Sequence, residues 1–256
     1  MPGLEYGEKA YAIAEKMHDT KLVAATSFDL YNVYTNLGEY TKIVSVSTHI
    51  IDLLEKNKME TDFCERPMAI YPVSCAYCAY GKGGLGDFEN SKIFIEKGLK
   101  VAETIQDQST LALTELMCGL VYLIRGEGKP AFDHFQIAIK CADEVKQTVL
   151  SMYATCYLGV SYGLLGEYES ARKHLETGIA IQKEIQVNMA LSINHCFLSQ
   201  VHYEMGNYKA ASSSIEKAVS LAQKHHEKAA EGYSRIWLGR IIAKSDRSQY
   251  NRAERS

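Results

Sequence analysis

The chain has 256 residues, of which 46% are apolar and 23% charged, and this composition is typical of a globular protein with a continuous core. Its formal net charge of −3 and its pI near 6.3 argue against a surface for nucleic acid or anionic membrane. Seven cysteines are scattered among apolar residues, which favours reduced thiols, and no signal peptide, transmembrane run or lipidation motif is present. We therefore expect a cytoplasmic protein that binds neither nucleic acid nor membrane.

The first predicted element is a helix near residues 8–17, which resembles the second helix of a pair without its partner. After it, a glycine followed by an acidic or amide residue recurs at positions 38, 86, 126, 166 and 206. From Gly86 onward the spacing is 40 residues, and the first interval of 48 contains a polar stretch around residues 58–66. Glycine ends a helix in the left-handed conformation at little cost, so each copy predicts a turn between two helices.

The residues that follow the turn glycines agree in type, which indicates a repeated helix. Small residues stand five positions after the glycines from position 86 onward: Ser91, Ala131, Ala171 and Ala211. Large apolar residues stand nine positions after them: Ile95, Phe135, Leu175 and Ile215. With further columns at twelve and thirteen, these offsets follow a helical stripe and not the alternation of a strand. The small residues let a neighbouring helix approach closely, and the large ones fill the space between helices.

One copy carries a complete repeat motif. Its residues are Leu158, Gly159, Tyr162, Gly166, Tyr168 and Ala171. At every one of these positions the copy resembles the signature of the tetratricopeptide repeat (TPR) family, which the other copies match in part. The period of 40 residues marks a long form of a repeat that commonly has 34. The resemblance implies an all-α fold, an α-α superhelix in which helix-turn-helix repeats stack as a solenoid, because one pair cannot bury its apolar face alone.

We expect residues 1–256 to form a single solenoid domain of about five to six repeats, with turns near residues 38, 86, 126, 166, 206 and 248. HEAT and armadillo repeats also have periods near 40 but lack this glycine–aromatic–alanine spacing. The half repeats at both ends indicate a fragment of a longer protein. The long period is similar to that of TPR arrays in multidomain bacterial signalling proteins, beside cyclase or ATPase modules.

Two motifs have the form of chemical sites, and the repeat explains both. Gly81–Gly86 matches the dinucleotide-binding pattern, but no strand precedes it and Gly86 is a turn glycine. Cys75 and Cys78 form a CxxC motif without further zinc ligands nearby, and Cys78 falls in a packing column. The eight histidines show no metal-ligating spacing. We expect no catalytic residue, metal or cofactor, so the chain is interpreted as a protein without enzymatic activity.

The resemblance implies that the first helix of each pair lines a concave binding face. By resemblance, the inward positions stand ten, six and three residues before each turn glycine. The candidate residues for binding protein or peptide are Phe28, Asn32, Tyr80, Leu116, Leu120, Leu123, Val160, Gln200, Tyr203 and Arg240. Only Asn32 and Arg240 suit the carboxylate clamp that some family members use, and they lie at opposite ends of the array. We therefore do not expect a clamp.

The apolar middle of this face admits two interpretations. A partner helix or apolar peptide lies in it, or long helices close the superhelix tightly and these residues form core. We favour core packing for Leu116 and Leu120, and partner contact for Tyr80 and Tyr203, which have polar neighbours.

These observations together favour an interaction or regulatory scaffold that binds a polypeptide segment. The alternative is a peptide-sensing regulatory domain whose superhelix changes curvature on binding. An enzyme that uses the glycine-rich or CxxC segment is a third alternative. The open ends of such an array offer surfaces through which two copies could form a homodimer.

Overall fold

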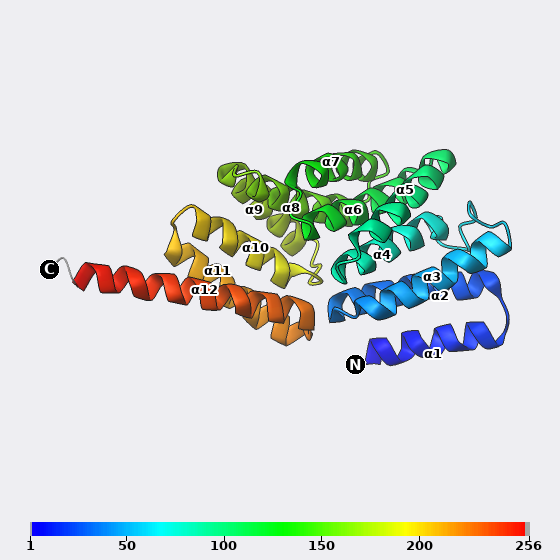
Figure 1. Cartoon of the computed structure of the whole chain (residues 1–256), viewed down its shortest axis with the longest axis horizontal. Coiled ribbons are helices and arrows are strands. Elements are labelled where there is room, and N and C mark those ends of the chain that lie inside the picture. The colour runs from blue at the N-terminus through cyan, green and yellow to red at the C-terminus, as the bar shows by residue number, and fades with distance from the viewer. Residues whose placement is uncertain (1, 254–256) are drawn as a thin grey trace. The chain divides into compact units, whose positions relative to one another are not determined.

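The computed structural model describes the backbone of residues 2–253 and the side chains of residues 3–244. The helices are α1 (Pro2–Lys16), α2 (Thr20–Leu37), α3 (Tyr40–Lys56), α4 (Ile70–Gly84), α5 (Phe88–Ile105), α6 (Gln108–Ile124), α7 (Gly128–Glu144), α8 (Thr148–Leu164), α9 (Tyr168–Glu184), α10 (Leu191–Glu204), α11 (Tyr208–His225) and α12 (Lys228–Ala253) (Figure 1). The described residues contain no strand, which confirms the all-α class. Within residues 2–253, no helix combines the length and apolar character that crossing a membrane requires.

Glycines in the left-handed conformation end the first helix of each pair. Gly38, Gly86, Gly126, Gly166 and Gly206 have φ between 74° and 83°. After Gly38, the amide of Glu39 donates to the carbonyl of Tyr34, and the same bond closes the other four turns. Because only glycine enters this conformation without a steric penalty, these five positions set the period of the repeat.

The turn expected near residue 248 is absent, and the prediction was wrong at this position. Helix α12 runs without a break from Lys228 to Ala253. The sequence from residue 240 to residue 256 contains no glycine, so nothing ends the helix as in the other copies.

The chain forms two compact units, which divide inside α8. Unit 1 spans Met1–Ala154 and unit 2 spans Thr155–Ser256. In unit 1, one cluster of buried side chains comes from α1 to α4 and includes Cys64 of the α3–α4 connection. In unit 2, the core cluster comes from α10, α11 and α12: Cys196, Ala211, Ile215, Ala218 and Ile241. Each unit therefore has its own core.

The small residues of the repeat lie where helices cross. In unit 2, a Cβ atom on Gly159 of α8 would meet the backbone oxygen of Ala171 in α9 at 3.0 Å and Leu175 at the same distance. Ala171 is fully buried on the facing helix. Since backbone atoms cannot move aside as a flexible side chain can, this crossing requires small side chains.

We expect Ala171→Leu to overpack this crossing and to lower the free energy of unfolding by roughly 1–3 kcal/mol. Urea unfolding followed by circular dichroism measures the loss. Lys173→Leu, at an exposed position of the same helix, is the matched control and should change stability by no more than about 0.5 kcal/mol. Equal stability of the Ala171→Leu variant and the unchanged chain would refute this packing.

Candidate functional site

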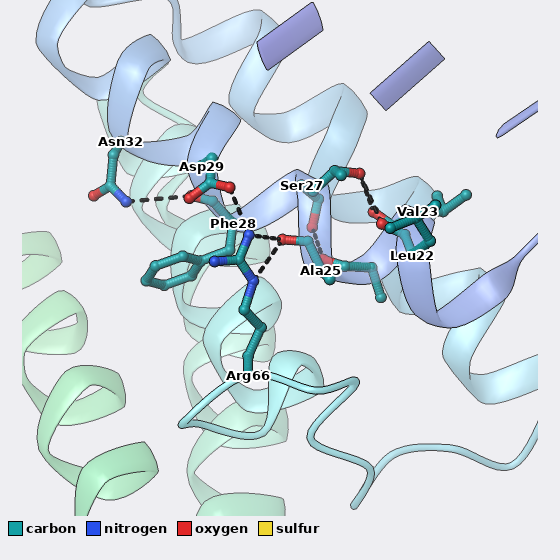
Figure 2. A network of polar contacts seen from close by, with 10 residues as sticks. Leu22, Val23, Ala25, Ser27, Phe28, Asp29, Asn32 and Arg66 are labelled. Carbon is teal, nitrogen blue, oxygen red and sulfur yellow. Dashed lines mark hydrogen bonds and ion pairs between the residues drawn. The ribbon is translucent and has the colours of Figure 1, made fainter. Parts of the chain in front are cut away.

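In unit 1, the predicted residues Phe28 and Asn32 lie one turn apart on α2, and both are half-buried. The guanidinium of Arg66 lies over the Phe28 ring, 5.7 Å from the ring centroid. Arg66 belongs to the connection between α3 and α4, and Figure 2 shows it extending across α2. A segment of the chain itself therefore already occupies this part of the predicted binding face.

A line of hydrogen bonds and stacked rings continues from Asn32 into the core of unit 1. The Asn32 Nδ2 atom donates to the Phe28 carbonyl at 3.2 Å, and its Oδ1 atom accepts from the Tyr77 hydroxyl at 3.1 Å. The Tyr77 ring stacks on Tyr31 with centroids 4.8 Å apart, and the Tyr31 hydroxyl donates to Ser74 at 3.0 Å. Burial raises the pKa of both phenols, so they act as neutral hydrogen-bonding groups. This network fixes the orientation of the Asn32 side chain.

The other predicted residues of unit 1 lie on α4 and α6. Tyr80 is half-buried and makes an edge contact with Tyr40 of α3 at 5.7 Å between ring centroids. Leu116 is only 5% exposed, so its side chain belongs to the packing between helices. Leu120 and Leu123 are half-buried on α6.

In unit 2, two of the predicted residues converge on a tryptophan. Tyr203 of α10 makes an edge contact with Trp237 of α12 at 6.0 Å, and the exposed Arg240 guanidinium lies 4.8 Å from the Trp237 ring. Gln200 donates from Nε2 to the sulfur of Cys196, and Val160 is half-buried on α8. The structure thus brings Tyr203 and Arg240 together through a residue that the sequence analysis did not select.

Unit 2 also contains an aromatic ladder, whose residues are not among those predicted from the sequence. The Phe197 ring of α10 makes edge contacts with Tyr157 of α8 at 6.3 Å and with Tyr233 of α12 at 6.1 Å. Tyr157 and Phe197 are half-buried, and Tyr233 is 40% exposed. Tyr157 and Phe197 stand in a column at 40-residue spacing, nine positions before the turn glycines, which could have identified them: Tyr77, Met117, Tyr157 and Phe197. The position of this column in α12 is Trp237, so Tyr233 had no such signal.

The CxxC and glycine-rich segments of α4 are packed into unit 1. Cys75 and Cys78 are fully buried, and burial raises the pKa of both thiols, which disfavours the reactive thiolate. A Cβ atom on Gly81 would lie 2.9 Å from Val44, and one on Gly84 would lie 2.5 Å from the Tyr40 ring. These two glycines therefore let α4 approach α3.

Two buried carboxylates outside these segments have structural partners. Glu115 of α6 is buried and pairs with the Nδ1 atom of His134 on α7. Glu227 is buried before α12 and accepts from the Ala190 amide at 3.1 Å and from the Ser192 hydroxyl. The described side chains include no group of three or more histidines, cysteines and acids placed to hold a metal ion.

Comparison with known proteins relates these helices to tetratricopeptide repeats. Residues 194–225, in α10 and α11, match the tetratricopeptide repeat family model. A search of curated protein sequences gave no match. BtubC (BKLC) from P. vanneervenii has 14% identity and a TM-score of 0.61, with 88% of this chain and 91% of that chain covered.

Two further solved structures have similar folds. A Rap protein complexed with Competence and Sporulation Factor has 14% identity and a TM-score of 0.65, with 94% of this chain and 69% of that chain covered. A signal transduction ATPase with a tetratricopeptide repeat sensor, from Pyrococcus horikoshii, has 13% identity and a TM-score of 0.56, with 93% and 42% covered. The chain therefore has the fold of TPR-like solenoid proteins, and the recognition of the repeat from sequence is confirmed.

Proposed function

We propose that this chain is a regulatory interaction module that binds a polypeptide segment along the first helices of its repeats. The fold class supports binding to protein or peptide, and one similar structure is a Rap protein complexed with Competence and Sporulation Factor. The aromatic ladder of unit 2, formed by Tyr157, Phe197 and Tyr233, is the observation that carries the proposal.

Half-exposed aromatic rings are well suited to hold a partner. They present a large apolar area, and their two rotatable bonds lose little entropy on binding. The edge contacts of Phe197 with Tyr157 and Tyr233 hold the rings in place before any partner arrives. Arg240, which is exposed and lies beside Trp237, adds a cation that can pair with an acidic residue of the partner.

The proposal is tested with a peptide selected on the full chain from a displayed library of random sequences. Titration of that peptide by isothermal calorimetry gives its affinity for the unchanged chain and for variants. We expect Phe197→Ala and Tyr233→Ala each to weaken binding by about tenfold or more, because centrally placed aromatic residues carry most of the energy of such contacts.

A matched control is available in the turn after α8. Leu165 is 42% exposed, close to the value for Tyr233, but lies outside the ladder. Leu165→Ala should leave the affinity unchanged. If the affinity falls equally in the control, or stays the same in both ladder variants, the ladder is not the binding surface.

We also propose a cytoplasmic location and a role in binding rather than catalysis. All seven cysteines are free and buried, as suits a reducing compartment. Four expectations stay predictions. They are a single domain, homodimer formation through the end helices, a signalling role, and a change of curvature on peptide binding. Small-angle scattering with and without the selected peptide tests the last of them, since identical curves would contradict it.

A further inference from the structure

The connection between α3 and α4 is longer than its place in the fold requires. It spans residues 57–69, whereas two residues join α5 to α6 and three join α7 to α8. It contains the eight residues by which the first repeat exceeds the others. Since shorter connections suffice between the other helices, these extra residues can make contacts beyond those needed to join α3 to α4.

Three contacts hold this connection against one face of α2. Asp62 pairs with Lys21 at 3.0 Å between Oδ2 and Nζ. Cys64 is 1% exposed and packs in the cluster that includes Val23 and Ala24. Arg66 reaches the Ala25 carbonyl one turn further on (Figure 2). Positions 21, 25 and 28 follow one helical stripe, and Asn32 continues it.

The Arg66 side chain is held by three groups of different chemistry. Its Nε and Nη2 atoms both donate to the Ala25 carbonyl, at 3.1 and 2.7 Å, and Nη2 pairs with Asp29 Oδ2 at 2.5 Å. The guanidinium also lies over the Phe28 ring. We name the Ala25 carbonyl, the Phe28 ring and the Asp29 carboxylate the guanidinium cradle. A planar fork of donors satisfies all three at once, whereas the compact ammonium of lysine does not.

The backbone that delivers Arg66 to the cradle is strained. Cys64 and Glu65, directly before it, have φ of 48° and 59°. Left-handed conformations of residues other than glycine are energetically unfavourable and persist where surrounding contacts enforce them. The cradle also stays reachable from solvent, because the Asp29 side chain remains 59% exposed while Arg66 is seated. A strained segment held over an accessible carboxylate can be exchanged for an external ligand.

We propose that residues 57–69 form a strap that occupies the partner-binding face of α2, and that an arginine of the partner segment displaces Arg66 from the guanidinium cradle. The inference rests on the proposed function, for which it names the partner chemistry and a means of regulation. The cradle supplies the acceptors and the ring face for that arginine. Release of the strap then exposes the α2 stripe only when a partner is present.

The cradle is tested with N-acetylarginine methylamide as the probe and the full chain carrying Arg66→Ala. We expect saturable binding by NMR titration, at least about tenfold tighter than to the unchanged chain, where Arg66 competes. The citrulline analogue of the probe, which has the same shape without the charge, should not bind. Adding Asp29→Asn to the Arg66→Ala variant should abolish binding of the arginine probe. Equal binding of both probes, or none to Arg66→Ala, would overturn the cradle.

The strap itself is tested in the unchanged chain, which avoids dependence on a variant that folds poorly. Cleavage by a glutamate-specific protease after Glu65 reports release, because the seated segment is held by Arg66 and Cys64. We expect saturating N-acetylarginine methylamide to accelerate cleavage several-fold, and the citrulline analogue to have no effect. Cleavage that the arginine probe does not accelerate would refute displacement.

The two proposals fail separately. Phe197→Ala tests peptide binding in unit 2, and the probe tests the cradle in unit 1. If Phe197→Ala does not weaken peptide binding, the probe is still expected to bind the cradle. If the probe does not bind the cradle, Phe197→Ala is still expected to weaken peptide binding.

Discussion

Replacing Phe135 with alanine is expected to lower the free energy of unfolding of unit 1 by about 3–5 kcal/mol. The side chain is fully buried on α7, and its ring fills the space left by Gly119 of α6, where a Cβ atom would lie 2.5 Å from the ring. Removing the ring leaves a cavity between two helices that cannot close on it without moving their backbones. Urea unfolding followed by circular dichroism measures the effect.

The matched control for this prediction is Phe132→Ala on the same helix. Phe132 is half-buried and has Lys129 5.0 Å from its ring centroid. Its removal should destabilise the chain by less than half as much, because most of the space it leaves opens to water. Equal losses for both substitutions would show that Phe135 is not the packing centre of this helix pair.

Acidification from pH 7 to pH 4 is expected to lower the free energy of unfolding by about 3 kcal/mol through His195 alone. Burial lowers the pKa of this histidine from 6.5 to about 4, and Lys183 and Lys217 add to the shift. Its Nδ1 atom has no hydrogen-bond partner among the described residues. Between pH 4 and 6.5 the unfolded chain therefore binds more protons than the folded chain, so the free energy of unfolding falls as the pH falls. Above pH 7, the contribution of His195 to the free energy of unfolding does not change with pH.

Urea midpoints measured across pH 4 to 8 test the histidine. His195→Gln removes the titrating group and should flatten the dependence below pH 6.5, although burial also lowers the pKa of His202 and leaves a smaller slope of the same sign. An unchanged slope in the variant would assign the acid sensitivity to other groups.

The parts of the fold that depend on local conformation could be predicted from the sequence. The five turn glycines are identified by spacing alone, because a left-handed helix end selects glycine whatever lies around it. The same rule explains the error at residue 248, where a copy of the motif without a glycine continues as helix α12. The crossing of Gly159 with Ala171 was also anticipated, since small residues at fixed offsets are a packing requirement of the repeat.

Which positions of the proposed binding face are exposed could be predicted only in part, because exposure depends on neighbours that one repeat does not reveal. The column ten positions before the turns is buried in four copies: Ala76, Leu116, Cys156 and Cys196. The column at nine positions, which carries Phe197, is half-exposed in unit 2 and was not selected. The extra residues near 58–66 were noticed, but their attachment to α2 depends on Arg66 and Asp29, which are 37 residues apart in sequence.

Hydrogen exchange of the full chain, measured with and without the selected peptide, tests whether the peptide binds along the first helices of the repeats. In unit 2, we expect slower amide exchange in the first helices α10 and α12, around Phe197 and Tyr233, with little change in α9 and α11. Protection confined to α9 and α11, with α10 and α12 exchanging as in the free chain, would contradict it.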